Sequence, residues 1–183
     1  MFYINYYFPD ENMVKKKLVE ISGWGRSIRE KCNLVEFKSS NIKNIFKEKK
    51  LIARGMGRSY GDSSLQRKQT INMINHRQII FFDKTKGILN VESGISINDV
   101  INRIIPQGFF LPVTPGSKFV TIGGMVASNV HGKNHHLDGG FSNFIISFVL
   151  LSNNGKKKIC SPSKNKDLFY ATIGGMGLTG IIL

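Results

Sequence analysis

Glycine-rich segments recur along this chain, and the first of them limits the folds that it can adopt. The run Arg54–Asp62 has the sequence RGMGRSYGD and follows a predicted strand at 51–53. Its glycine spacing differs from the GxGxxG fingerprint of a Rossmann fold, and no apolar helical face follows it. No glycine precedes Lys-Ser or Lys-Thr, as a P-loop requires. The run therefore predicts a loop of exposed backbone amides that binds an anion, with added charge from Arg54 and Arg58.

A second group of small residues lies between positions 115 and 132. It consists of Pro115–Ser117, Thr121–Gly124 and Ser128–Gly132. Because glycine carries no Cβ, such segments let the backbone approach a flat or charged ligand closely. Two glycine-rich groups in one β-rich chain favour an extended dinucleotide over a single phosphate.

Apolar periodicity and turn residues predict an α+β chain with more strands than helices. A helix is predicted over 97–105, where Ser96 and Asp99 resemble a capping box. A shorter helix is predicted after Ser40, within a β-α-β unit, and Asn153–Gly155 predicts a hairpin turn. Strands are predicted at 34–37, 51–53, 79–82, 88–92, 144–151, 156–160 and 181–183.

The 183 residues carry a net charge of +14. An excess of this size fits a phosphate-rich partner such as a dinucleotide, a nucleic acid or a phospholipid surface. It also fits solvated lysines in turns, the interpretation that we favour for Lys15–Lys17 and Lys156–Lys158. A nucleic-acid-binding module is the alternative from a different class. The aromatic residues do not alternate with basic ones along a strand, however, as base stacking requires.

Three observations bear on localisation. No apolar run approaches the roughly 20 residues that span a bilayer. Met1–Phe8 is aromatic without a preceding basic region, unlike a signal peptide. Cys32 and Cys160 form no CxxC pair, which favours a reducing compartment. We therefore expect a cytoplasmic protein whose membrane contact, if any, is peripheral.

Taken together, the motifs resemble the FAD-binding domain of the vanillyl-alcohol-oxidase superfamily, also called the PCMH type. Within it they are similar to the flavoprotein subunits of the decaprenylphosphoryl-ribose 2′-epimerase family. The resemblance covers nearly the whole chain and implies two α/β subdomains, at about 1–85 and 86–183, with FAD between them. The matching motifs are GWGR at 23–26, ARGMGRSYGD at 53–62, PGS at 115–117, VTIGG at 120–124, HGKNHH at 131–136 and DLFYATIGGMGLTG at 167–180.

The resemblance also implies roles for individual residues. Arg58 stands where many relatives carry a histidine joined to the flavin, so non-covalent FAD is implied. His131, beside the flavin ring, and Lys133, on the substrate side, are the implied catalytic residues. The implied cofactor-binding residues are Ala53, Arg54, Gly55, Met56, Gly57, Arg58, Ser59, Tyr60, Gly116, Ser117, Thr121, Ile122, Gly123, Gly124, Ser128, Asn129, Val130, His131, Gly132, Gly180 and Ile181.

Plainer interpretations of the same residues stay open. The HGKNHH segment could hold a metal ion, but Asp138 is the only carboxylate near it, and we expect no metal site. His131 could be a hydrogen-bonded core histidine. Tyr60 and Trp24 could be core aromatics, the interpretation that we favour for Trp24.

The implied reaction is oxidation of a sugar alcohol, with hydride passing to N5 of the flavin. The implied substrate is a small-molecule or lipid-linked sugar, with the 2′-hydroxyl of a polyprenylphosphoryl-ribose favoured. An aldonolactone or alditol oxidase is the alternative enzyme. Relatives continue into a substrate domain, whereas this sequence ends at Leu183. We therefore expect these residues to be inactive alone. The expected partners are a second chain with that domain and an NAD-dependent reductase, not nucleic acid.

Overall fold

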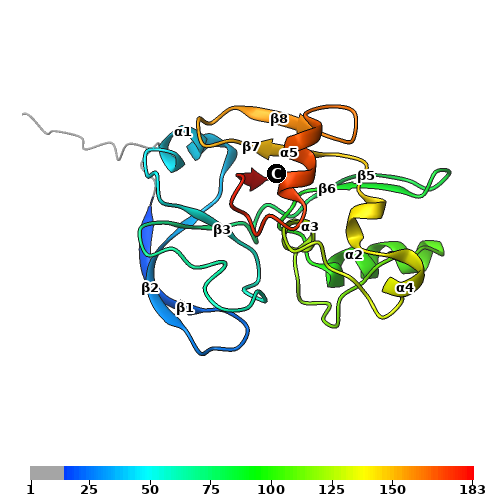
Figure 1. Ribbon diagram of the computed structural model, residues 1–183, viewed down its shortest axis with the longest axis horizontal. Helices are drawn as coiled ribbons and strands as arrows, with labels where there is room; N and C mark the ends of the chain where they lie inside the picture. Colours follow the sequence, from blue (N-terminus) through cyan, green and yellow to red (C-terminus); the bar gives the residue numbers. More distant parts are fainter. Residues whose placement is uncertain (1–14) are drawn as a thin grey trace, which may run out of the picture.

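The computed structural model of the protein describes residues 15–183, so the segment Met1–Phe8 lies outside the described residues. Figure 1 shows two parts side by side, with the C-terminal strand between them. The first part contains a four-stranded sheet, and the second contains a two-stranded and a three-stranded sheet. This mixture of strands and helices confirms the α+β class. No helix within residues 15–183 is long and apolar enough to cross a membrane.

The first sheet has the strand order β1-β2-β4-β3. Its strands are β1 (Lys16–Ser22), β2 (Arg29–Glu36), β3 (Ile52–Arg54) and β4 (Thr70–Asn72). β1 and β2 form an antiparallel hairpin, and β2 and β3 each run parallel to β4. A 3-10 turn (Ser39–Asn41) and α1 (Ile42–Ile45) connect β2 to β3. The predicted β-α-β unit is present, but β4, which was not predicted, lies between its two strands.

The prediction that Ser40 caps the short helix is wrong. Ser40 lies inside the 3-10 turn, and the N-cap residue of α1 is Asn41, whose side chain makes no capping hydrogen bond. Packing stabilises this helix instead, because Ile45 is fully buried in the core of the first part.

The second part begins with an antiparallel hairpin of β5 (Ile79–Asp83) and β6 (Ile88–Val91). The domain division predicted near residue 85 falls in the turn of this hairpin. α2 (Ile97–Ile104) packs Val100 and Ile104 against the hairpin. The Ser96 half of the predicted capping box is confirmed, since its hydroxyl accepts a hydrogen bond from the backbone amide of Asp99. The Asp99 carboxylate accepts from the Ser96 hydroxyl at 2.8 Å, not from the Ser96 backbone amide as a capping box requires. A 3-10 turn (Ile105–Gln107) ends the helix.

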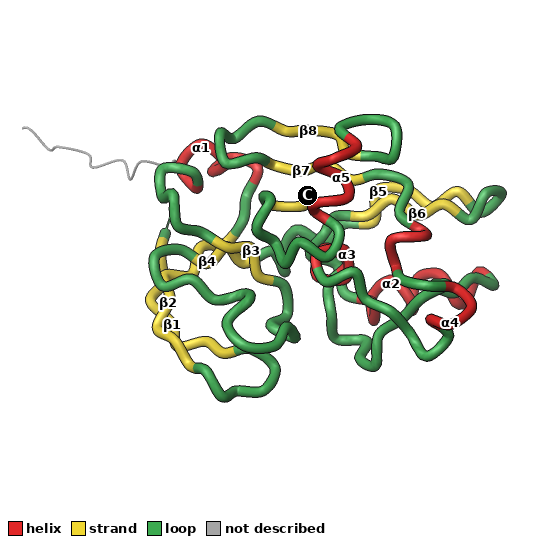
Figure 2. The backbone as a smooth tube through the Cα atoms, in the orientation of Figure 1, coloured by secondary structure: helices red, strands yellow, loops and turns green. Residues whose placement is uncertain are grey.

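The remaining elements are short and are joined by long loops (Figure 2). They are α3 (Ile122–Ala127), α4 (His135–Asp138), a 3-10 turn (Phe141–Phe144), β7 (Phe148–Leu151), β8 (Lys157–Cys160), α5 (Lys166–Thr172) and β9 (Ile181–Ile182). The strands form one antiparallel sheet in the order β8-β7-β9. The predicted hairpin at Asn153–Gly155 is confirmed. Gly155 in this turn adopts a positive φ of 75°.

The three-stranded sheet joins the two parts of the molecule. On one face, Leu150 and Ile182 pack into the core of the second part, together with Met125 and Phe169. The neighbouring residues Leu151 and Ile181 join the core of the first part, with Val35, Ile45 and Ile71. Both parts therefore share β7 and β9, and their relative position is set by side-chain packing.

Candidate functional site

The first glycine segment forms an irregular loop that begins directly after β3. Within the described residues, no backbone amide from Gly55 to Asp62 donates a hydrogen bond to a protein acceptor. Gly57 and Gly61 adopt positive φ angles of 67° and 57°, which redirect the chain twice within this loop. A run of unused amides with this backbone is suited to an anion.

Arg54 supports this loop from inside the protein. Its guanidinium donates to the carbonyl of Ser22 at 2.7 Å and to the hydroxyl of Ser64 at 3.0 Å. It also lies directly under Gly57, where a Cβ would overlap it. Burial lowers the pKa of the Arg54 guanidinium, because desolvation penalises the charged form. Arg54 thus fixes the shape of the loop, and its positive charge lies on the protein side of the loop.

Arg58 has the opposite environment, because it is exposed on the outside of the loop. Its Nη1 donates to the carbonyl of Met56 at 2.8 Å, and its guanidinium carbon lies 5.5 Å from the centre of the Trp24 ring. The prediction that Trp24 is a core aromatic is wrong, since 54% of its surface is exposed. Tyr60 is not a core aromatic either, because it is 77% exposed.

The Thr121–Gly124 segment forms the beginning of α3, a helix that the sequence did not predict. The Thr121 hydroxyl accepts a hydrogen bond from the Gly124 amide. The amides of Ile122 and Gly123 donate to the carbonyls of Ile95 and Ser93 at 2.9 and 2.8 Å. These amides are therefore hydrogen-bonded within the protein and are not available to a ligand. What the segment can offer a ligand is backbone that carries no side chain.

The two glycine groups meet at one point. A Cβ on Gly55 would overlap the Thr121 side chain, so the first loop lies against the start of α3. Gly124 and Gly116 differ from Gly55 in this respect. A Cβ on Gly124 would meet only the Thr121 hydroxyl, at 3.1 Å, and a Cβ on Gly116 would meet nothing within 4 Å. Backbone at these two positions is open to a ligand.

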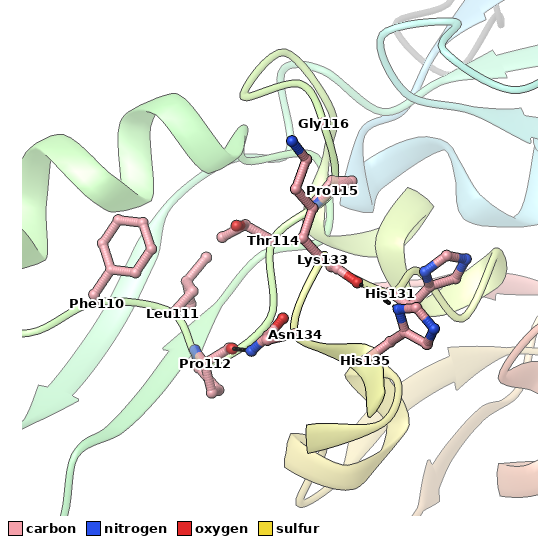
Figure 3. Close-up of a pocket in the computed structure, with 11 residues that line it drawn as sticks. Phe110, Leu111, Pro112, Thr114, Pro115, Gly116, His131, Lys133, Asn134 and His135 are labelled. Atoms are coloured by element: carbon pink, nitrogen blue, oxygen red, sulfur yellow. Dashed lines mark hydrogen bonds between the residues drawn. The ribbon is translucent and has the colours of Figure 1, made fainter. Parts of the chain in front are cut away.

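A pocket of about 730 Å³ lies between the segments 110–116 and 131–135 (Figure 3). Gly116, His131, Gly132 and Lys133 of the predicted site line it. Pro115 belongs to the predicted Pro115–Ser117 segment. Sequence reasoning missed the other lining residues, which are Phe110, Leu111, Pro112, Thr114, Asn134 and His135. Asn134 and His135 belong to the HGKNHH motif, so the motif was the signal that could have indicated them.

Asn134 ties the two walls of this pocket together. Its side-chain amide donates to the carbonyl of Pro112 at 2.9 Å and to the carboxylate of Asp138 at 2.6 Å. His135 supports His131, because their ring centres lie 5.2 Å apart in an edge-on arrangement. In residues 15–183, no three His, Cys, Asp or Glu side chains are grouped closely enough to hold a metal ion.

The remaining predicted residues lie elsewhere. Ser128 is exposed, whereas the Asn129 side chain accepts a hydrogen bond from the Ser142 amide at 3.1 Å, and Val130 packs on the core. Gly180 lies against the carbonyl of Leu151, and Ile181 is 1% exposed. No described residue of the first loop, 55–62, lines the pocket.

Comparison with known proteins identifies the family. A family model described as an FAD binding domain matches residues 42–161. A decaprenylphosphoryl-β-D-ribose oxidase of Mycolicibacterium smegmatis is 42% identical over 135 residues, which are 73% of this chain and 29% of that protein. The Δ24-sterol reductase of Rattus norvegicus is 32% identical over 111 residues, or 61% of this chain and 22% of that protein.

A third relative, from Neurospora crassa, is named for D-arabinono-1,4-lactone oxidase activity. It is 26% identical over 136 residues, covering 73% of this chain and 24% of that protein. The chain therefore spans less than a third of the length of each of these relatives. With the family model covering well over half of the sequence, the chain belongs to the FAD-binding domain family of the PCMH type.

Proposed function

We propose that this chain binds FAD without a covalent bond and forms the flavin-binding part of an oxidoreductase. The observation that carries the proposal is the loop from Gly55 to Asp62, whose amides have no protein acceptor in the described chain. The FAD pyrophosphate is an anion of the kind that such a loop binds. Arg58 can add charge-assisted hydrogen bonds to it, and an arginine in place of a histidine supports non-covalent binding.

The other residues fit a flat, extended cofactor. Gly116 leaves open space where a Cβ would stand, and Gly124 is exposed with only the Thr121 hydroxyl close to that position, so a ring system can lie against their backbone. Thr121 joins this surface to the first loop through its contact with Gly55. Of the predicted cofactor residues, Ile181 can offer only its backbone, because its side chain lies in the core. When bound, FAD supplies a two-electron acceptor for hydride.

The pocket supports a sugar alcohol as the substrate. The neutral imidazole of His131 can accept the proton that a hydroxyl group loses during its oxidation. Lys133 has no carboxylate within ion-pair distance among the described residues, so its ammonium is available for a phosphoryl group. The resemblance to the decaprenylphosphoryl-ribose oxidase supports the 2′-hydroxyl of a polyprenylphosphoryl-ribose as the reacting group.

A lactone or alditol oxidase is the second candidate, and the similarity to the Neurospora crassa protein favours it. The partners that we propose are a chain or segment with a substrate domain and an NAD-dependent reductase. A lipid-linked substrate would place the protein at the cytoplasmic surface of a membrane.

The visible spectrum of the purified protein after incubation with FAD tests the proposed cofactor. We expect a bound flavin that acid releases into solution, and no mass added to the denatured chain. A protein that takes up no flavin would refute the proposal, and flavin retained after denaturation would refute the non-covalent part.

In a protein completed by the proposed substrate domain, flavin bleaching without oxygen then separates the two substrates. A polyprenylphosphoryl-ribose with a short lipid should bleach the flavin, and free aldonolactones should not. Lys133→Met should weaken this response, whereas Lys118→Met, a change at an exposed lysine outside the pocket, should not. Bleaching by lactones alone would favour the second candidate.

A further inference from the structure

Trp24 is the only tryptophan of the sequence, and it lies in the turn between β1 and β2. It is 54% exposed and belongs to none of the three hydrophobic clusters. A large aromatic ring in this position loses most of the benefit of burial. The ring faces one charged group, the guanidinium of Arg58, at 5.5 Å.

The turn that carries Trp24 is fixed to the first glycine loop by its backbone. The Trp24 amide donates to the carbonyl of Ser59 at 2.9 Å. A Cβ on Gly23 would overlap the carbonyl of Gly61 and lie 2.8 Å from that of Ser59, so only glycine allows this approach. The Ser22 carbonyl accepts the hydrogen bond from Arg54. Three consecutive residues, 22–24, therefore contact either the loop or Arg54, which supports the loop.

The contact between Trp24 and Arg58 leaves most of the guanidinium free. An arginine has five N–H donors, and one of those of Arg58 is used on the Met56 carbonyl. Contact with the face of an aromatic ring fixes the orientation of the guanidinium without using a donor. The remaining donors stay available at the edge of the group, in the same loop as the amides that have no protein acceptor.

We propose that Trp24 is a positioning residue for Arg58, holding its guanidinium over the loop so that its free donors meet the phosphate groups of the bound dinucleotide. This inference rests on the proposed binding of FAD at the same loop. It assigns a role to the GWGR motif that is distinct from the packing role expected of a tryptophan.

Calorimetric titration with FAD, ADP and riboflavin tests this role, because riboflavin lacks the pyrophosphate. Trp24→Ala should weaken FAD and ADP by about 2- to 5-fold, the scale of an exposed cation–π contact, and should leave riboflavin unchanged. Trp24→Phe should restore most of the affinity, because it keeps an aromatic face. Leu18→Ala, which removes an exposed side chain of the same hairpin, should change none of the three.

A double-mutant cycle decides whether Trp24 acts through Arg58. In the Arg58→Ala background, Trp24→Ala should have no further effect on FAD affinity. Full additivity would overturn the inference, and so would an equal loss of riboflavin binding or failure of Trp24→Phe to restore affinity. If the unmodified protein binds neither FAD nor ADP, the proposed function fails and this inference fails with it. If the unmodified protein binds both and the cycle is additive, only the inference fails.

Discussion

The two glycine-rich segments share their glycine content but have different roles in the structure. In the first loop, the amides from Gly55 to Asp62 have no protein acceptor within the described chain. At the start of α3, the amides of Ile122 and Gly123 are used by carbonyls of the preceding segment. The glycines of the loop thus expose backbone donors, whereas Gly123 allows two elements to pack closely. A glycine motif alone therefore does not show whether its glycines expose amides to a ligand or allow close packing. The hydrogen-bond acceptors of its amides must be known first.

The largest expected effects come from the two arginines of the first loop. Arg58→Ala should weaken FAD by about 1.5–3 kcal/mol, the range for a hydrogen bond to a charged group, with little change in stability. Arg54→Ala should instead destabilise the protein by about 1–3 kcal/mol, because the half-buried Ser22 carbonyl loses this donor and the buried Ser64 hydroxyl keeps only its contact with Ser59. Titration and thermal unfolding of both variants check this. If both variants lost FAD affinity and stability to the same extent, the two arginines would not have separate roles in binding and in folding.

Gly123 and Gly124 form a matched pair within α3. A Cβ on Gly123 would lie 2.8 Å from the Cβ of Ser93, so Gly123→Ala should cost about 1–3 kcal/mol of stability through overpacking. Gly124→Ala should change stability by less than about 1 kcal/mol, because a helical glycine gains from replacement by alanine. Unfolding by urea measures both variants. If Gly124→Ala destabilises the protein more, α3 does not pack on Ser93 as described.

Bulk at Gly124 should affect the ligand and not the fold. Gly124 is exposed, and a Cβ there would meet only the hydroxyl of Thr121. We therefore expect Gly124→Val to remain folded and to lose FAD binding, because the branched side chain fills the open surface. Circular dichroism together with flavin titration tests this. Normal FAD affinity in the valine variant would remove Gly124 from the cofactor site.

The smallest expected effect is a dependence of stability on pH through His76. His76 Nδ1 lies 3.0 Å from a carboxylate oxygen of Glu92, in the segment that leads to Ser93. Burial lowers the pKa of His76 and Lys157 lowers it further, against the opposing effect of Glu92. The folded state therefore favours the neutral ring. The neutral His76 ring therefore contributes to the stability of the folded state at pH values above its ordinary pKa near 6.5. This stability is lost as pH falls through the lowered pKa of the folded state.

Thermal unfolding between pH 7.5 and 5 measures this contribution. The melting temperature should fall on acidification, and the fall should be smaller in His76→Gln. An identical fall in both proteins would assign the effect to other groups.

The sequence predicted the elements whose signals are local. α2 was predicted because Ser96 caps it and its apolar residues recur at helical spacing. β4 was missed because it has only three residues, too few to show the alternation of a strand. α3 was missed because two glycines oppose a helix, and contacts with the carbonyls of Ser93 and Ile95 compensate for them.

The sequence also indicated part of the candidate site, but not all of it. The pocket brings Gly116, His131, Gly132 and Lys133 together, and the roles that the resemblance implies for them stay predictions. The difference between Arg54 and Arg58 could not be predicted, because both are arginines of one glycine-rich motif. Burial of Arg54 results from β1 and from Ser64, which are remote from it in sequence.

The sharing of β7 and β9 between the two cores has a consequence for synthesis on the ribosome. Ile71 and Val35 of the first sheet emerge early, but their packing partners Leu151 and Ile181 emerge last. The first sheet therefore cannot complete its core until the final strand of the described chain has left the exit tunnel. Until then its apolar surface stays uncovered, and chaperones can bind it.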